Sequence, residues 1–193
     1  MVSLVVKLQI PSAVLNGPAG VCENALAEFE VNLTGTAPWT LIINNGFEID
    51  TVYNIMASPY IFTVQPDGPG TKTAQVLKVQ DVYYTGLYTG IPIEYIVHPL
   101  PLAAGPVMGQ TDICRGSTSV HYQVYGIAYA TDYEWTFPQG CTYGFYYSWG
   151  HANVWVNFPE GAQSGTISVR GKNACGYGAS SEIYVTIHEL PVV

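Results

Sequence analysis

Asp132 and Glu134 are the best candidates in this chain for a pair of catalytic carboxylates. Because side chains alternate between the two faces of a β-strand, residues two positions apart project from the same face. Two neighbouring carboxyl groups are what glycoside hydrolysis requires. The same spacing fits the solvent face of a strand whose other face carries Tyr133 and Trp135, and we favour this second interpretation.

The four histidines do not form a recognisable catalytic or metal-binding motif. His121 and His151 could bind a metal if the fold brought them together, but neither has a second ligand at a metal-binding spacing. His98 and His188 occupy corresponding positions beside terminal prolines, which indicates a feature of a repeat. No serine lies in a G-x-S-x-G or related nucleophile motif. We therefore predict that the chain is not an enzyme and uses no metal and no cofactor.

Aromatic residues are concentrated between Cys141 and Trp155, in the sequence CTYGFYYSWGHANVW. Exposed aromatic rings can stack on sugars or anchor protein contacts. The candidate binding residues from this segment are Tyr143, Tyr146, Tyr147 and Trp149. The favoured alternative is a large core together with packing between domains, because a sandwich of this size needs a few large internal side chains. Trp39 and Trp135 are assigned to hydrophobic cores.

The composition excludes several classes of partner. Only 10% of the residues are charged, the net charge is −8, and the 6 basic residues are scattered, so nucleic acid is not an expected partner. Gly, Pro or polar residues interrupt every apolar run before it could span a membrane, and no membrane insertion is expected. The first residues lack the cationic and cleavage regions of a signal peptide, which suggests a mature or truncated fragment.

Short alternating segments separated by turns predict an all-β protein. The 193 residues are 48% hydrophobic and include 15 Tyr, 20 Gly and 13 Pro, which suits pleated strands joined by tight turns. Asn45-Gly46, between two apolar segments, predicts a β-hairpin with a type I′ turn. Turn signals recur about every ten residues, as is typical of β-sandwiches.

A repeated closing strand divides the chain into two domains. An alternating strand that ends in proline occurs in residues 2–11, 92–101 and 181–191. We predict two tandem β-sandwiches, residues 1–102 and 103–193. Residues 1–11 would be either the first strand of the first domain or the tail of a preceding repeat. The short, proline-rich join from Pro99 to Pro106 predicts a semi-rigid connection.

Several motifs of the second half are characteristic: Gly105-Pro106, ICRGS ending at Ser117, YEWTFPQG from Tyr133, GHANVWVNFPEGAQSGTISVRGKNACG from Gly150, and the closing YVTIHELP. With these motifs the second half resembles the PKD-like and immunoglobulin-like repeats of adhesins and other surface and secreted multidomain proteins of Bacteroidetes. The first half resembles a sister repeat through VCEN, LTGTAPWT and SPYIFTVQP. The resemblance covers nearly the whole chain. It implies two tandem immunoglobulin-like or PKD-like β-sandwiches in an exported protein.

The resemblance also implies a disulfide bond between Cys114 and Cys175, because such repeats carry one cysteine before the second strand and another after the penultimate strand. In the first half Tyr84 stands at the position of the second cysteine, which leaves Cys22 without its usual partner. Cys141 occurs where the family has a small or aliphatic residue, so Cys114 could pair with Cys141 instead. An exported location is compatible with any of these bonds.

Together these features predict a non-catalytic structural or adhesion module of a cell-surface or secreted bacterial multidomain protein. It would act as a spacer or as an interaction segment. The expected partners are other domains of the same parent protein, surface proteins and glycans. The alternative function is a carbohydrate-binding module that uses exposed aromatic residues of the second domain and could be accessory to a hydrolase.

Overall fold

The computed structural model describes residues 9–87, 90–148 and 151–189, which form strands and connecting loops without any helix. The chain is therefore all-β, as predicted. It divides into two compact units, Met1–Pro99 and Leu100–Val193. The sequence placed this division three residues later, after residue 102. Leu102 is held to the second unit because its N–H donates to the Ala128 carbonyl at 3.0 Å.

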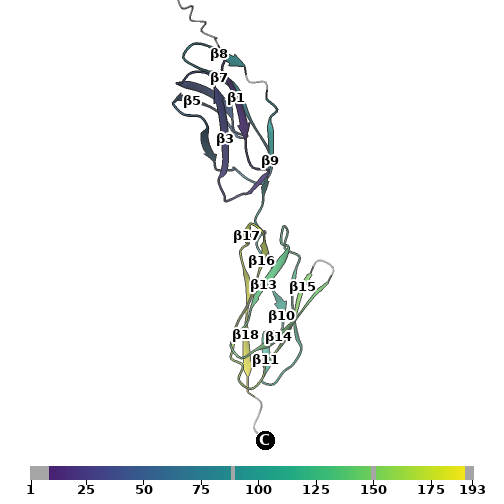
Figure 1. The fold of residues 1–193 in the computed structure, drawn as a ribbon. Coiled ribbons are helices and arrows are strands. Elements are labelled where there is room, and N and C mark those ends of the chain that lie inside the picture. Colours follow the sequence, from purple (N-terminus) through teal and green to yellow (C-terminus); the bar gives the residue numbers. More distant parts are fainter. Residues whose placement is uncertain (1–8, 88–89, 149–150, 190–193) are drawn as a thin grey trace, which may run out of the picture. The chain divides into compact units, whose positions relative to one another are not determined.

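The first unit contains two sheets (Figure 1). The smaller sheet has the order β1–β3–β6, with bounds Ser12–Asn16, Ala27–Thr34 and Tyr60–Val64. The larger sheet has the order β2–β9–β7–β4–β5, with β8 beside β7. Its strands are β2 (Gly20–Cys22), β4 (Trp39–Asn44), β5 (Ile49–Ile55), β7 (Gly70–Gln80), β8 (Thr85–Leu87) and β9 (Ile93–His98). Of the predicted opening strand, residues 9–11 lie outside any strand, and the remainder lies outside the described residues.

Alternation along β3 explains how the first core forms. Its buried residues are Ala27, Phe29, Val31 and Leu33. They pack against apolar side chains of the larger sheet, including Leu41 and Val97. Trp39 also lies in this core, as predicted, and its Nε1–H donates to the Thr34 carbonyl at 3.1 Å.

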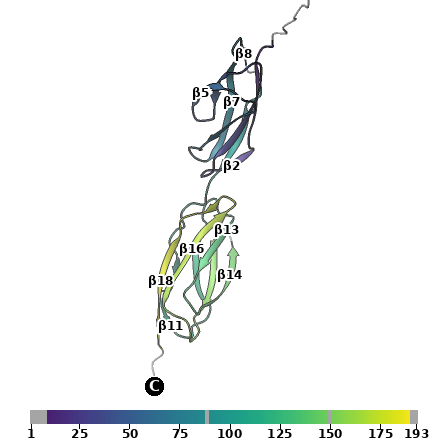
Figure 2. The same cartoon turned by 60° about the vertical axis from the view of Figure 1, so that its left-hand side comes forward.

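The second unit also contains two sheets (Figure 2). One has the order β10–β12–β15–β14, with bounds Met108–Gly109, Val120–Tyr125, His151–Asn157 and Thr142–Ser148. The other has the order β11–β18–β16–β13, with bounds Asp112–Cys114, Ser181–His188, Gly165–Asn173 and Asp132–Thr136. β17 (Gly176–Tyr177) pairs with β16. Trp135 is 7% exposed and belongs to the core between these sheets, as predicted.

The strand that follows the tryptophan-bearing strand, β4 in the first unit and β13 in the second, joins a different sheet in each unit. In the first unit, β5 pairs with β4 through a hairpin loop of residues 45–48. Gly46 has a φ of 99°, and the Asn45 side chain accepts hydrogen bonds from the N–H groups of Phe47 and Glu48, each at 3.0 Å. The predicted hairpin is therefore present. It has a four-residue loop stabilised by Asn45, whereas the sequence suggested a two-residue type I′ turn.

In the second unit, β14 leaves the sheet of β13 and pairs with β15. Pro138 follows β13 and has no N–H to extend that ladder. Gly140 takes a φ of 83°, and the Gln139 carbonyl accepts a hydrogen bond at 3.0 Å from Gln163, in the loop after β15. The loop between β13 and β14 thus carries the chain across to the opposite sheet.

The predicted disulfide between Cys114 and Cys175 is wrong. Cys114 and Cys141 carry free thiols, whereas Cys22 and Cys175 are disulfide-bonded. Cys114 lies beside His188, at the last residue of β18. Ser181, the first residue of β18, pairs with Val169 of β16, and Cys175 lies further along the chain, after the end of β16. A strand rises about 3.3 Å per residue. The length of β18 therefore separates the two cysteines by far more than a disulfide can span. The alternative bond between Cys114 and Cys141 is also absent.

Candidate functional site

The candidate carboxylate pair lies on the outer face of β13. Glu134 pairs in register with Arg170 of β16 and forms a salt bridge with it, and Asp132 pairs in register with Lys172. Opposite charges placed across neighbouring strands stabilise a sheet face. The structure therefore places both acids on a solvent face, in agreement with the favoured interpretation of the sequence.

The histidines make local contacts. His121 Nε2 lies 2.9 Å from Asn153 Oδ1, and the imidazole packs on the indole of Trp155 with ring centroids 4.8 Å apart. His188 contacts Asp112 at 2.9 Å, and this hydrogen bond lowers the pKa of the Asp112 carboxyl. The side chain of His151 lies outside the described residues. Within the described ranges no group of three or more His, Cys, Asp or Glu is placed to hold a metal ion.

Tyr143 is the one predicted binding residue whose side chain the structure describes. It belongs to β14 and is 52% exposed, and its ring stacks on Phe137 with centroids 4.1 Å apart. Phe145 and Trp135 extend this group, which we call the edge cluster: Trp135, Phe137, Tyr143 and Phe145. Tyr146 and Tyr147 pair in register with Asn153 and Ala152, but their side chains and the whole of Trp149 lie outside the described residues.

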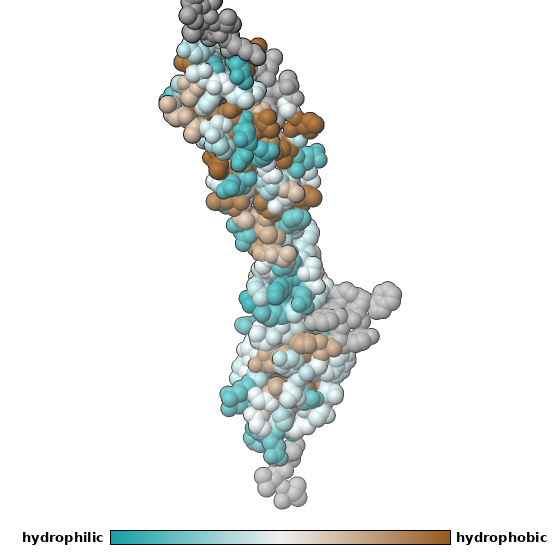
Figure 3. Space-filling model, viewed as in Figure 1, coloured by the Kyte–Doolittle hydropathy of each residue, from teal (hydrophilic) through white to brown (hydrophobic). Residues whose placement is uncertain are grey.

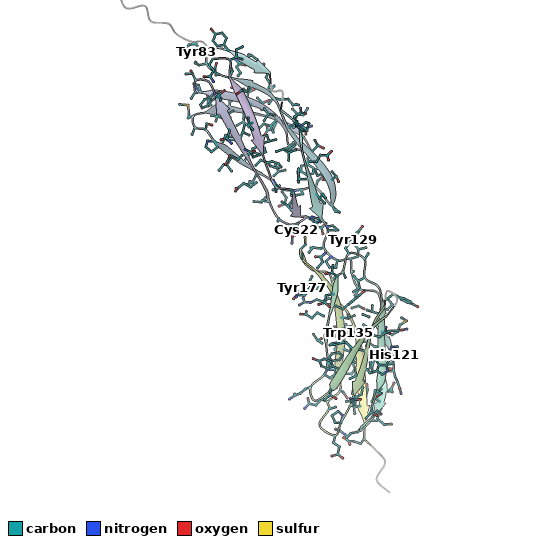
Figure 4. All side chains as sticks on the ribbon, turned by 45° about the vertical axis from the view of Figure 1, so that its right-hand side comes forward. Cys22, Tyr83, His121, Tyr129, Trp135 and Tyr177 are labelled. Atoms are coloured by element: carbon teal, nitrogen blue, oxygen red, sulfur yellow. The ribbon has the colours of Figure 1, made fainter. Side chains whose placement is uncertain are left out.

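The edge cluster fills the gap where β14 and β13 form facing edges of the two sheets. Tyr143 and Phe145 pair in register with Val156 and Val154, which are buried, so their rings lie on the inner face of their sheet. Trp135 lies within the second unit, as Figure 4 shows. Its buried Nε1–H has no hydrogen-bond partner among the described residues, unlike that of Trp39. The cluster therefore combines core packing with about half-exposed rings.

A second aromatic surface lies on the outer face of the same sheet, and its main aromatic residue, Trp155, was not among the residues chosen from the sequence. Trp155 is 37% exposed and lies in register between His121 of β12 and Gly144 of β14. The segment NVWVN could have indicated the outward position of Trp155. Val154 and Val156 are apolar and suit the core, and alternation then places Trp155 on the opposite face of the strand.

The first unit has a cleft of about 580 Å³ at its own edge, between β5 and β6. Its walls carry the aromatic rings of Phe47 and Phe62 and the carboxylates of Glu48, Asp50 and Asp67. The Lys72 ammonium lies 2.6 Å from Asp67 and 4.7 Å from the centroid of the Phe47 ring. The sequence did not indicate this cleft, because its residues come from strands of different sheets and from the loops beside them.

The shifted titrating groups have structural roles. Burial alone would raise the pKa of Asp81, but hydrogen bonds from the N–H groups of Thr36, Tyr84 and Tyr83 hold its pKa below the usual value. Burial raises the pKa of Tyr122 to about 12, and its hydroxyl donates to the Gln110 carbonyl at 2.7 Å. Burial also raises the pKa of the Cys141 thiol. These groups are held within turns and cores, where their hydrogen bonds and packing stabilise the fold.

Comparison with known proteins identifies the class of fold. A family model described as "PKD-like domain" matches residues 100–185, which corresponds to the second unit. No curated protein matches the chain. The chain thus has an all-β fold of the immunoglobulin-like or PKD-like kind.

Several solved structures are similar over nearly the whole chain. The titin domains Z1Z2, solved in complex with telethonin, are 16% identical over 96% of this chain and 100% of theirs, with a TM-score of 0.36. The Bacteroides ovatus protein SGBP-B of a mixed-linkage glucan utilization locus, solved with a mixed-linkage heptasaccharide, is 16% identical over 92% of this chain and 48% of its own, with a TM-score of 0.33. Domains 5–6 of the S-layer protein SbsC are 13% identical over 90% of this chain and 96% of theirs, with a TM-score of 0.27.

Proposed function

We propose that this chain is a non-catalytic interaction segment of a cell-surface or secreted bacterial multidomain protein, in which it acts in adhesion or as a spacer. Its partners would be other domains of the parent protein, surface proteins or glycans. The PKD-like match and the disulfide bonding of Cys22 and Cys175 support an extracellular location, because disulfides persist in oxidising compartments. The described part of the chain has no helix that could cross a membrane.

The observation that carries this proposal is an apolar hollow of about 430 Å³ on the first unit. It lies where the chain passes from β5 to β6, and it is distinct from the cleft of about 580 Å³ because different residues line most of it. Tyr53, Met56 and Ile61 line it and are 68%, 71% and 54% exposed. Figure 3 shows strongly hydrophobic areas on the visible face of this unit. Large apolar side chains gathered at a surface hollow mark a site that another protein covers.

Surface plasmon resonance on a panel of immobilised extracellular proteins tests the proposal. We expect the chain to bind at least one of collagen, fibronectin, laminin and mucin, and the double variant Tyr53→Ser, Met56→Ser to bind about tenfold more weakly, since a lost apolar anchor costs at least about 1.4 kcal/mol. The matched control is Tyr184→Ser, which changes a tyrosine that is 60% exposed on the second unit. Binding that is equal in all three proteins, or no binding at all, would contradict an adhesive role for the hollow.

The second candidate function is carbohydrate binding by aromatic residues of the second unit, Tyr143, Tyr146, Tyr147 and Trp149. The observation that favours it is the half-exposed ring of Tyr143, which Phe137 holds in place by stacking. A glycan array that compares the parent chain with Tyr143→Ala tests this function. If the chain is accessory to a hydrolase, the reading frame that contains it will also encode a catalytic domain.

A further inference from the structure

The two outer faces of the second unit differ in chemical character. The outer face of β13 and β16 carries cross-strand pairs of opposite charge, such as Glu134 with Arg170. The outer face of β12, β15 and β14 carries no Asp, Glu, Lys or Arg at any described outward position. The residues there are His121, Gln123, Tyr125, Thr142, Gly144, Asn153, Trp155 and Asn157. In a chain with 14 acidic residues, this face is therefore neutral, aromatic and rich in amides.

From this juxtaposition we infer that the outer face of β12, β15 and β14 is a binding platform for an uncharged sugar, with Trp155 as its stacking surface. The inference rests on the carbohydrate-binding function proposed above and assigns it to residues other than the edge cluster. The C–H face of a pyranose packs on an aromatic ring, while its hydroxyl groups exchange hydrogen bonds with amides and imidazoles. A charged peptide would find no opposite charge here.

Two side-chain contacts hold the platform in position. The strand pairing places His121 directly beside Trp155, and their ring centroids lie 4.8 Å apart at an interplanar angle of 35°. Asn153 is 6% exposed and fixes His121 through a contact of 2.9 Å between Oδ1 and Nε2. Gln123 lies in register with Asn153 and is half-buried, so its amide borders the same surface. His121 lies at the surface of the unit, apart from the core residue Trp135 (Figure 4).

Gly144 leaves room for a ligand beside the indole. It pairs in register with Trp155, and a Cβ atom built at this glycine would have no heavy atom of the described side chains within 4 Å. Its φ lies outside the left-handed region, so the backbone does not itself require glycine at this position. The missing side chain therefore leaves the strand position beside Trp155 without a side chain of its own.

Affinity gel electrophoresis with uncharged soluble polysaccharides tests the inference. The panel contains a β-glucan, a galactomannan, a xylan and dextran, and we expect at least one of them to retard the parent chain. Trp155→Ala should weaken that binding at least about tenfold. Gly144→Val keeps the indole but fills the space beside it, and should weaken the binding to a similar degree. Tyr184→Ala, on the outer face of the other sheet, is the matched control and should bind like the parent. Thermal unfolding establishes that each variant is folded.

The outcomes separate this inference from the function on which it rests. Loss of binding in Trp155→Ala and Gly144→Val, with Tyr143→Ala unaffected, supports the platform. Loss in Tyr143→Ala alone overturns the platform but leaves carbohydrate binding at the edge cluster. If no polysaccharide in the panel retards the parent chain, both are overturned.

Discussion

The two units share a strand plan but differ in one edge strand. In the first unit β5 continues the sheet of β4, and a cleft of about 580 Å³ lies between β5 and β6. In the second unit β14 joins the opposite sheet, where Tyr143 and Phe145 meet Phe137. Moving one strand between sheets thus changes an open, acidic cleft into an edge filled with aromatic rings. It also creates the neutral outer face around Trp155. The differing edge strand therefore accounts for the proposed binding surfaces of both units.

The units also differ in the polar residue at the end of their longest strand, which is Asp81 directly after β7 and Asn173 as the last residue of β16. In the first unit Asp81 accepts hydrogen bonds from the N–H groups of Thr36, Tyr83 and Tyr84 at 2.7–3.0 Å and is 5% exposed. In the second unit Asn173 accepts from the Cys175 N–H at 2.8 Å and donates to the Tyr129 carbonyl at 3.0 Å. Tyr129, Tyr177 and Tyr83 lie at ends of their respective units (Figure 4). A carboxylate and an amide thus stabilise similar turns.

The largest predicted effect is that of Asp81→Ala. It leaves three backbone N–H groups without their acceptor and should lower the free energy of unfolding of the first unit by about 3 kcal/mol. Urea denaturation of the parent and the variant, followed by tryptophan fluorescence, measures this change. A loss of less than about 1 kcal/mol would show that water replaces the carboxylate at little cost.

Phe137→Ala should lower the free energy of unfolding of the second unit by about 2 kcal/mol, because Phe137 joins Trp135 to the half-exposed rings of Tyr143 and Phe145. Tyr184→Ala should change it by less than about 0.5 kcal/mol, since Tyr184 is 60% exposed. Equal effects in the two variants would show that the edge cluster does not stabilise the second unit.

Acid should destabilise the first unit through Asp81. Because its pKa is lower in the folded unit than in the unfolded chain, its contribution is complete above the unfolded pKa, about 4, and is lost as the pH falls through the folded value. Asp81→Asn should remove this part of the pH dependence. Asn173 does not titrate, so the corresponding turn of the second unit should make no such contribution. Urea denaturation from pH 7 to pH 2 tests this, and a pH profile that is the same in parent and variant would contradict it.

The four cysteines provide a test with a smaller expected effect. Without reductant, iodoacetamide should label Cys114 and Cys141 and leave Cys22 and Cys175 unmodified. Cys114 is exposed, whereas Cys141 is half-buried and burial raises its pKa. Labelling of Cys141 should therefore be about tenfold slower, because the thiolate is the reactive form. Peptide mass spectrometry gives both rates, and labelling of Cys175 would contradict the bonding described above.

Much of the fold could be predicted from local patterns. The alternation of Phe29, Val31 and Leu33 fixes which face of β3 is buried, and Asn45-Gly46 marks a hairpin. The sheet that β14 joins could not be predicted, because its aromatic residues suit either sheet and the choice depends on the loop at Pro138 and Gly140. The prediction of a bond between Cys114 and Cys175 was wrong for a similar reason. The spacing of cysteines in the sequence does not show which end of a sandwich each one reaches.

Backbone nuclear Overhauser effects test most directly the claim that the two units differ in one edge strand. We predict contacts between strands for the pairs Phe145 with Val154 and Tyr143 with Val156 in the second unit, and Leu41 with Val52 in the first. Contacts between β14 and β13 in place of those between β14 and β15 would contradict the claim. Such a result would return both units to a single strand plan and remove the basis for the outer face around Trp155.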